Sequence, residues 1–200
     1  MNAFNFLLIN RENKPRTKGI TMVLDKGLGL ETASSLMEIA SEYVDFVKFG
    51  WGTTVVHNYD LIKDKIAMYK SHNIIPYTGG TLFELAYANG KLDEFFKEAH
   101  ELGFPAVEIS DGSCMMNHDD KINCIKLAKD EGFIVLSEVG KKNPDLDKKI
   151  SLEQRINQMN DELDAGSSYI IVEAREGGKN IGIFDKSGNV KSDDVNFICN

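Results

Sequence analysis

Short apolar runs alternate with helix-like stretches along most of the chain. Runs at 20–24, 46–49 and 74–77 are followed by three more at 106–112, 134–142 and 169–176, each of which passes through a glutamate into polar residues. Between the runs, apolar residues recur three or four positions apart, a spacing typical of one buried helix face. The pattern predicts six buried strands that alternate with helices.

Two helix starts have capping-box spacing, in which Ser or Thr is followed three residues later by Glu or Gln. Thr81 with Glu84 and Ser151 with Gln154 both show it, so we expect helices to begin there. The end of the chain is ambiguous, since 195–199 suits either a helix or a seventh strand. The wider segment 177–200 is rich in Gly, Asn, Asp and Lys and is expected to be mostly loop.

Six strand–helix repeats fit either a doubly wound sheet or a TIM (β/α)8 barrel. No Gly-rich dinucleotide fingerprint follows the first run, and polar residues recur at every strand end, so the barrel is favoured. A closed barrel takes eight strands and about 250 residues, whereas this chain has 200. We therefore predict an α/β fold with one barrel domain over 1–200, of which about six βα units are present and the C-terminal units are missing.

Three glutamates mark the ends of the last three runs. Glu108, Glu138 and Glu173 lie 30 and 35 residues apart, about the length of a βα unit. Each is expected at the carboxyl end of a parallel strand, where such folds bind ligands. A buried carboxylate needs a cation or hydrogen bonds. The three therefore indicate a metal site, for which Mg²⁺ is a suitable hard cation, or structural ion pairs with nearby lysines.

Three cations lie within or just after predicted strands. Lys48 lies inside an apolar run and Lys26 follows the first run, so each is either a ligand-binding cation or a locally paired or solvated charge. Arg175 stands two residues after Glu173, and both are expected to face the same side of an extended segment. A guanidinium there suits bidentate binding of a carboxylate, phosphate or sulfite.

Two lysines and two glycines complete the candidate site. Lys141 and Lys142 follow Glu138, and either is a candidate general acid, the alternative being a surface lysine. Gly79 and Gly80 at a helix start offer backbone N–H groups to an anion, although such a pair is more often only a turn.

Composition narrows the class of partner. A net charge of −8 and a pI near 5.1 argue against nucleic acid and fit a cytoplasmic protein. Three cysteines without metal-site spacing are expected to be free thiols of a reducing compartment. The segment 1–10 is too short for a signal peptide or membrane span and is expected to be a surface-docking segment or arm.

Taken together, the motifs resemble the phosphosulfolactate synthase family. The resemblance extends from about residue 14 to about residue 190 and rests on segments 14–16, 25–27, 45–53, 79–84, 108–112, 138–142 and 173–176. It implies a TIM barrel that adds sulfite to phosphoenolpyruvate with Mg²⁺, giving (2R)-phospho-3-sulfolactate, an early intermediate of coenzyme M or sulfolactate biosynthesis. Family members continue through two more strands than this chain.

The resemblance also implies roles for the candidate residues. Lys141, or alternatively Lys142, would be the acid that protonates the carbon bearing the phosphate. Lys26, Lys48, Arg175, Gly79 and Gly80 would bind the anionic substrates, and Glu108, Glu138 and Glu173 would be metal ligands.

Two other functions remain open at this level. One is a noncatalytic stress or interaction protein of the same fold, like the plant heat-stress relatives of the family. The other is a different TIM-barrel enzyme of enolate chemistry, with the same metal and lysine but another nucleophile. An unpaired strand edge exposes backbone hydrogen-bonding groups, so a homo-oligomer is expected, with small anionic substrates and neither nucleic acid nor membrane as partners.

Overall fold

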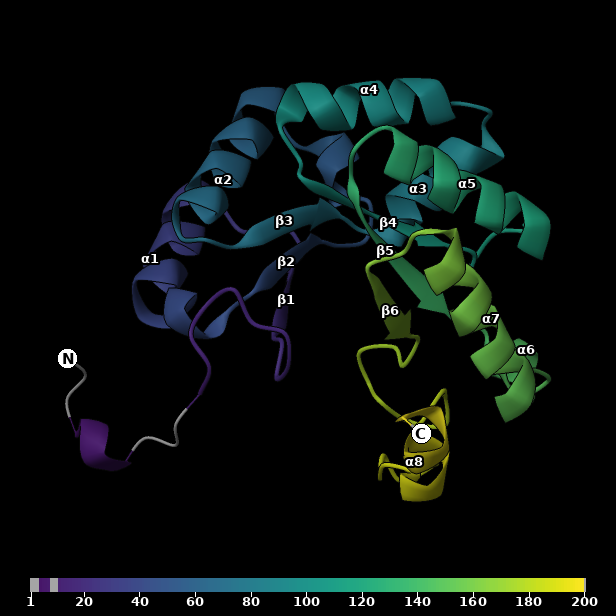
Figure 1. Ribbon diagram of the computed structural model, residues 1–200. Coiled ribbons are helices and arrows are strands. Elements are labelled where there is room, and N and C mark those ends of the chain that lie inside the picture. Colours follow the sequence, from purple (N-terminus) through teal and green to yellow (C-terminus); the bar gives the residue numbers. More distant parts are fainter. Residues whose placement is uncertain (1–3, 8–10, 200) are drawn as a thin grey trace.

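The computed structural model describes residues 4–7 and 11–199 and contains one parallel sheet. All six predicted runs form strands, and these pair in sequence order. They are β1 (Met22–Asp25), β2 (Phe46–Phe49), β3 (Ile75–Thr78), β4 (Ala106–Ser110), β5 (Ile134–Val139) and β6 (Tyr169–Val172). The sheet is curved, and the helices cover its outer side (Figure 1). This is the incomplete TIM-barrel arrangement that the sequence predicts.

Helices connect successive strands, as parallel pairing requires. The α-helices are α1 (Leu30–Ala40), α2 (Tyr59–Ser71), α3 (Gly80–Ala88), α4 (Leu92–Leu102), α5 (His118–Asp130), α6 (Pro144–Asp147), α7 (Leu152–Ala165) and α8 (Ser192–Cys199). Short 3₁₀ turns are η1 (Asn5–Leu7), η2 (Ser41–Tyr43) and η3 (Thr53–Val56). Within the described ranges, no helix is long and apolar enough to cross a membrane.

Side chains alternate between two faces along each strand, as extended backbone dictates. The outward set, with Val47, Phe49 and Val107, packs against the helices in the main core. The inward set, with Phe46 and Tyr77, forms a smaller apolar cluster on the concave side. Phe46 on β2 meets Tyr169 on β6 edge to face at 5.1 Å, although three strands separate them. This contact shows how tightly the sheet curls.

One predicted capping box is correct and the other is wrong. Ser151 and Gln154 cap α7 reciprocally. Helix α3 does start in the predicted place, but its N-cap is Gly79 and no side chain caps it. Glu84 instead turns inward, where partners distant in the sequence replace the local cap.

The two ends of the chain differ in part from expectation. Residues 192–199 form α8, so the ambiguity at 195–199 resolves to a helix, and the segment after β6 is less loop-like than predicted. At the other end, Phe4, Phe6 and Leu7 are exposed around η1, and Figure 1 shows η1 standing apart from the sheet. The rest of the predicted docking segment, 1–3 and 8–10, lies outside the described residues.

A buried ion pair fixes the end of β1. Asp25 and Lys65 are each 1% exposed, and Lys65 Nζ lies 2.7 Å from Asp25 Oδ2. Tyr69 donates its hydroxyl to the same oxygen at 2.8 Å, and the backbone N–H groups of Gly27 and Leu28 donate to Asp25 Oδ1. Burial alone would raise the pKa of Asp25, but Lys65 and these donors hold it below its usual value.

Replacing Lys65→Met should lower the free energy of unfolding by about 3–5 kcal/mol, because one charge of a buried pair is left unpaired. Urea unfolding followed by far-UV circular dichroism measures the loss. The pKa of folded Asp25 lies below the ordinary value of 3.8. The pair's contribution is therefore complete above that value and disappears as the pH falls through the folded pKa, so wild type and variant should converge in acid.

The matched control is Lys91→Met, which breaks an exposed pair with Glu94 at 2.6 Å. Its expected cost is much smaller than that of Lys65→Met, because exposed ion pairs contribute little to stability. Equal losses for the two variants would contradict a special role for the buried pair.

Candidate functional site

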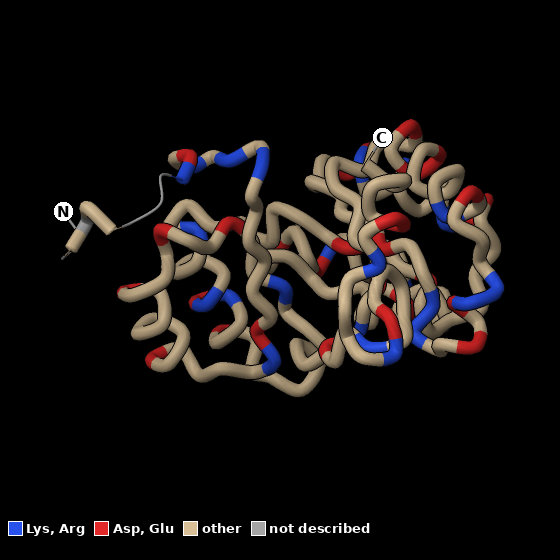
Figure 2. The backbone as a smooth tube through the Cα atoms, turned by 90° about the horizontal axis from the view of Figure 1, so that it is seen from below, with Lys and Arg blue, Asp and Glu red and all other residues tan. Residues whose placement is uncertain are grey.

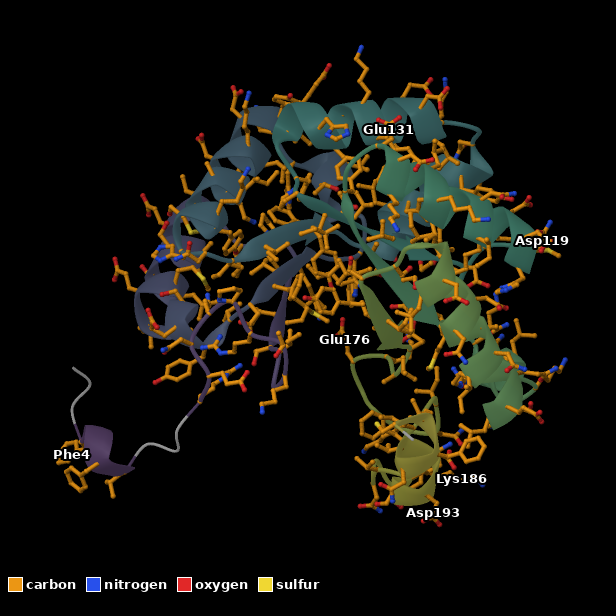
Figure 3. All side chains as sticks on the ribbon, viewed as in Figure 1. Phe4, Asp119, Glu131, Glu176, Lys186 and Asp193 are labelled. Carbon is orange, nitrogen blue, oxygen red and sulfur yellow. The ribbon has the colours of Figure 1, made fainter. Side chains whose placement is uncertain are left out.

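The candidate site is a cavity of about 740 Å³ at the carboxyl ends of the strands. It lies between the first and last strands, and in Figure 3 the labelled Glu176 lies in the hollow between β1 and β6. Its lining includes most of the predicted charged residues. They are Lys48, Glu138, Lys142, Glu173 and Arg175, with Trp51, Thr81 and Ser113 beside them.

Three charged side chains meet on the concave face above the inner apolar cluster. Lys48 on β2 places Nζ 2.7 Å from Glu108 Oε1 on β4 and 3.5 Å from Glu138 Oε2 on β5. The strand register explains the meeting, since Lys48 pairs with Tyr77 and Glu108 with Leu136, so the three side chains share the inward face. Of the three glutamates expected to converge, Glu108 and Glu138 share Lys48, which is the ion pairing that the sequence left open as the alternative, and Glu173 lies on the wall of the cavity.

The two carboxylates carry more acceptor capacity than the protein around them uses. Glu108 and Glu138 are 1% and 4% exposed, yet Glu108 Oε2 and Glu138 Oε1 are buried without a hydrogen-bond partner, as is the Tyr77 hydroxyl. Buried polar atoms are normally satisfied. Their state indicates that the site is built for a further group that supplies positive charge or donors.

The pKa values of the titratable groups at this cluster are shifted from their ordinary values. Burial, and then the charge of Glu108, raises the pKa of Glu138 to about 8, although Lys48 opposes the shift. Burial would lower the pKa of Lys48, but Glu108 and Glu138 outweigh it and raise that pKa. Burial and the same two carboxylates raise the pKa of Tyr77. One lysine thus compensates two adjacent carboxylates incompletely, a pattern common at functional sites.

One glycine of the predicted pair, Gly80, binds a buried carboxylate. Gly80 N–H donates to Glu108 Oε1 at 2.9 Å. A Cβ on Gly80 would collide with Ser110 Oγ and would lie 2.6 Å from Glu108 Oε1, and one on Gly79 would lie 2.8 Å from the Phe49 carbonyl oxygen. Glycine is therefore required here for close approach, and at least one of the N–H groups expected to bind an anion is directed at a protein carboxylate.

The two adjacent lysines point to different places. Lys141 Nζ contacts the Asp111 carboxylate and donates to the Asp111 carbonyl oxygen at 2.8 Å. Lys142 lines the main cavity, with Nζ 3.1 Å from Thr81 Oγ1 and 3.4 Å from Glu84 Oε1. Of the two predicted candidates, Lys142 is therefore the one beside Glu138.

The loops after β6 and β1 carry the two remaining cations, Arg175 and Lys26, at the mouth of the cavity. Arg175 has φ 51°, a left-handed conformation, and its backbone N–H donates to Glu173 Oε1 at 2.6 Å. Both residues line the cavity, although the chain turns at Arg175 and is not extended there as predicted. Lys26 pairs with Glu176 at 2.6 Å and lies 4.4 Å from the Trp51 ring centroid. This pair connects the loops that follow the two edge strands.

A second cavity of about 870 Å³ adjoins the first. Ser113, Lys142 and Arg175 line both, so the two cavities meet at these residues. Lys141 and the segment 112–116 form another part of its wall. Figure 2 shows Lys and Arg interspersed with Asp and Glu along the described chain, so the cations at this junction are a local feature of an acidic protein.

Sequence reasoning missed several charged residues that support the site. Lys121 pairs with Glu162 at 2.7 Å and Asp111 at 3.0 Å, and it donates to the Glu138 carbonyl oxygen at 2.7 Å. The carboxylate of Asp111 is shared by Lys121 and Lys141. The available signal was the charge of Lys121 on the apolar stripe of a helix.

A second missed group holds the loop that carries the two lysines. Asp147 accepts from Arg155 at 2.9 Å and from the backbone N–H groups of Lys141 and Gly182 at 3.1 and 3.0 Å. A Cβ on Gly140 would lie 2.8 Å from an Arg155 nitrogen, so glycine gives this loop its close packing.

The residues present fit a divalent cation of the Mg²⁺ type. Among the described residues, no group of three carboxylate, imidazole or thiol side chains is arranged to hold a metal ion by itself. Mg²⁺ needs only one or two carboxylates, with water or substrate oxygens completing its octahedron. The unpartnered oxygens of Glu108 and Glu138 meet that requirement.

Comparison with solved structures agrees with the fold. A phosphonopyruvate hydrolase in complex with oxalate and Mg²⁺ superposes with a TM-score of 0.54 at 10% identity, covering 79% of this chain and 59% of the other. A phosphoenolpyruvate phosphomutase from Streptomyces platensis subsp. rosaceus gives 0.51 at 15% identity, covering 80% and 61%. At such low identity the likeness shows the fold alone. Fold and site together define a protein of the TIM-barrel type with a charged cavity at the carboxyl ends of its strands.

Sequence comparison identifies the family. Residues 9–200 match the family described as (2R)-phospho-3-sulfolactate synthase (ComA). Phosphosulfolactate synthase of Methanothermobacter thermautotrophicus is 51% identical over 198 residues, 99% of this chain and 77% of that protein. Phosphosulfolactate synthase of Bacillus subtilis is 39% identical over 191 residues, 96% of this chain and 74% of that protein. The chain belongs to the phosphosulfolactate synthase family and is shorter than these members, as the sequence indicates.

Glu138→Gln should make the protein more stable at neutral pH. The folded pKa of Glu138, about 8, exceeds the ordinary value of 4.5, so the unfolded state releases the proton first and stability falls as the pH rises between these values. The variant lacks this cost. In a chelator, its gain in unfolding free energy should be absent near pH 4 and reach on the order of 4 kcal/mol near pH 8.

Urea titrations at several pH values measure the difference. The control is Glu94→Gln, which removes an exposed carboxylate on α4 and should give a nearly pH-independent difference above pH 5. A loss of stability in Glu138→Gln that is equal at pH 5 and pH 8 would show that the carboxyl group is not strained.

Proposed function

We propose that this protein catalyses the Mg²⁺-dependent addition of sulfite to phosphoenolpyruvate, giving (2R)-phospho-3-sulfolactate. The observation that carries the proposal is the pair of buried carboxylates with unpartnered oxygens, Glu108 and Glu138, set among Lys48, Lys142 and Arg175 at the strand ends. Membership of the family supports the same reaction. This product is consistent with an early step of coenzyme M or sulfolactate biosynthesis in the cytoplasm.

The metal would be held by Glu108 and Glu138, with Glu173 as a further candidate on the cavity wall. When bound, a divalent cation supplies positive charge opposite the substrate carboxylate as electrons move onto it. Lys48 keeps the two glutamates from repelling each other before the metal and substrate arrive. The unpartnered oxygens of the two glutamates would then be metal ligands.

The anionic substrates would be bound by the cations of the cavity. Sulfite uses its sulfur lone pair to form a bond to the methylene carbon of phosphoenolpyruvate, while the carbon that bears the phosphate gains a proton. The carbon–oxygen and phosphorus–oxygen bonds of the phosphate ester stay intact. Arg175 at the junction of the two cavities suits an oxyanion, and Lys48 lines the first cavity. Lys26 is the further candidate, paired with Glu176 beside Arg175.

Lys142 is the better candidate for the acid. It lies in the same cavity as Glu138, whereas the Lys141 ammonium is held by both the carboxylate and the carbonyl oxygen of Asp111. A general acid must reach the atom that it protonates. Lys141 then contributes by fixing the segment after β4 rather than by donating the proton.

The direct test measures phosphosulfolactate formation from phosphoenolpyruvate and sulfite with the purified protein. Product should form with Mg²⁺ and fall to background with EDTA, and added Mg²⁺ should restore it. Glu108→Gln and Glu138→Gln should each lower the rate at least about 100-fold, because charge stabilisation at such sites contributes several kcal/mol. Glu94→Gln is the control and should keep the wild-type rate.

Folded protein that forms no product with Mg²⁺ would overturn the proposal, as would activity that survives EDTA. The expected homo-oligomeric state remains a prediction that light scattering on the same sample can check.

The two lysines are separated by comparing Lys142→Met with Lys141→Met. Loss of a general acid should lower kcat by about 10²–10⁴-fold for Lys142→Met. Lys141→Met should cost less than about 10-fold, because its ammonium is engaged by Asp111. Steady-state kinetics in saturating sulfite provides the comparison, and the opposite order of effects would return the acid role to Lys141.

A further inference from the structure

Glu84 is a buried carboxylate that the proposed chemistry does not use. It lies one helical turn into α3, is 4% exposed, and points toward the end of β4. Ser110 donates its hydroxyl to Glu84 Oε1, and the backbone N–H groups of Gly112 and Ser113 donate to Oε1 and Oε2 at 3.1 and 2.7 Å. The carboxylate thus anchors the start of the loop after β4.

The same carboxylate contacts the Lys142 ammonium. Lys142 Nζ lies 3.4 Å from Glu84 Oε1, with side-chain exposures of 20% and 4%. The backbone of Lys142 also donates to the Gly112 carbonyl oxygen at 3.1 Å. Helix α3, the loop after β4 and the loop after β5 therefore meet at Glu84, Gly112 and Lys142.

Gly112 leaves room for the lysine side chain. A Cβ there would lie 3.2 Å from Lys142 Cγ, 3.3 Å from Cε and 3.4 Å from Glu138 Oε1. The Lys142 side chain therefore runs over Gly112 beside the unpartnered oxygen of Glu138. Glu84 therefore holds the amino group next to the proposed metal ligands.

We propose that Glu84 is a positioning residue that holds the Lys142 ammonium toward the reacting carbon. This inference rests on the proposed function and on Lys142 as its acid. Thr81 Oγ1 is the other side-chain acceptor near Nζ, at 3.1 Å, and is exposed. The buried charge of Glu84 is the stronger determinant of where the ammonium stays, since a charged acceptor roughly doubles the strength of a hydrogen bond.

A double-mutant cycle separates positioning from general support of the loop. Glu84→Gln preserves the size of the side chain and one acceptor oxygen but removes the charge. In the wild-type background it should lower kcat about 10–100-fold with less than about a 3-fold change in KM for phosphoenolpyruvate. In the Lys142→Met background it should have almost no further effect, because the group it positions is absent.

The controls follow from the structure. Thr81→Val removes the neutral acceptor and should cost less than Glu84→Gln, and Glu84→Asp should recover part of the lost rate. Glu94→Gln removes a carboxylate that pairs with a surface lysine on α4 and should change nothing. A cycle in which the two losses multiply would overturn the positioning role.

A second readout needs no activity. Brief acetylation of the amines with acetic anhydride, read by peptide mass spectrometry, compares Lys142 with its neighbour Lys141. In Glu84→Gln the labelling of Lys142 should rise several-fold relative to wild type, while Lys141, which Asp111 holds, should stay unchanged. Equal increases at both lysines, or no increase at Lys142, would overturn the inference.

The two proposals fail in different ways. Wild-type protein without Mg²⁺-dependent product removes the proposed reaction, and the labelling ratio still tests the contact between Glu84 and Lys142. Wild-type activity combined with independent effects of Glu84→Gln and Lys142→Met keeps the reaction and removes Glu84 from it.

Discussion

The structure of the site depends on placing two carboxylates side by side on the inner face of a curved parallel sheet. Glu108 and Glu138 come from neighbouring strands and share one lysine, Lys48, from a third. Burial of like charges is unfavourable unless each is paired, and here one cation serves two anions. The raised pKa of Glu138 and the unpartnered oxygens are both consequences of this arrangement. The buried pair of Asp25 with Lys65 is satisfied more fully, since Tyr69 also donates to the same carboxylate.

Helix α3 does more for the site than cover the sheet. Its first residue donates a backbone N–H to Glu108, and one turn later Glu84 anchors the loop after β4 and contacts Lys142. Two glycines allow this, because a side chain at Gly80 or Gly112 would press on a carboxylate or on Lys142. One helix start thereby fixes both the proposed metal ligand and the proposed acid. Changes in this segment should affect chemistry before they affect the fold.

The strands were predictable from sequence because buried parallel strands are continuous apolar runs, and a glutamate at the same place in three of them is conspicuous. The direction in which a side chain points from a loop was not predictable from the sequence. Lys141 and Lys142 are equivalent by position, and only the tertiary contacts with Asp111 and Glu84 separate them. Thr81 and Glu84 had the correct local spacing for a cap, but three donors from the end of β4 offered Glu84 a buried alternative. Long-range partners overrode local signals at the residues that form the site.

The mouth of the cavity is held less firmly than its floor. Below it, Phe46 and Tyr169 bring β2 and β6 together through a ring contact at the apolar inner face. At the mouth, Lys26 and Glu176 join the loops after β1 and β6 through a pair whose side chains are 40% and 47% exposed. Such exposed pairs contribute about 0–1 kcal/mol. The curl of the sheet therefore depends on apolar contact far more than on the ion pair at the mouth.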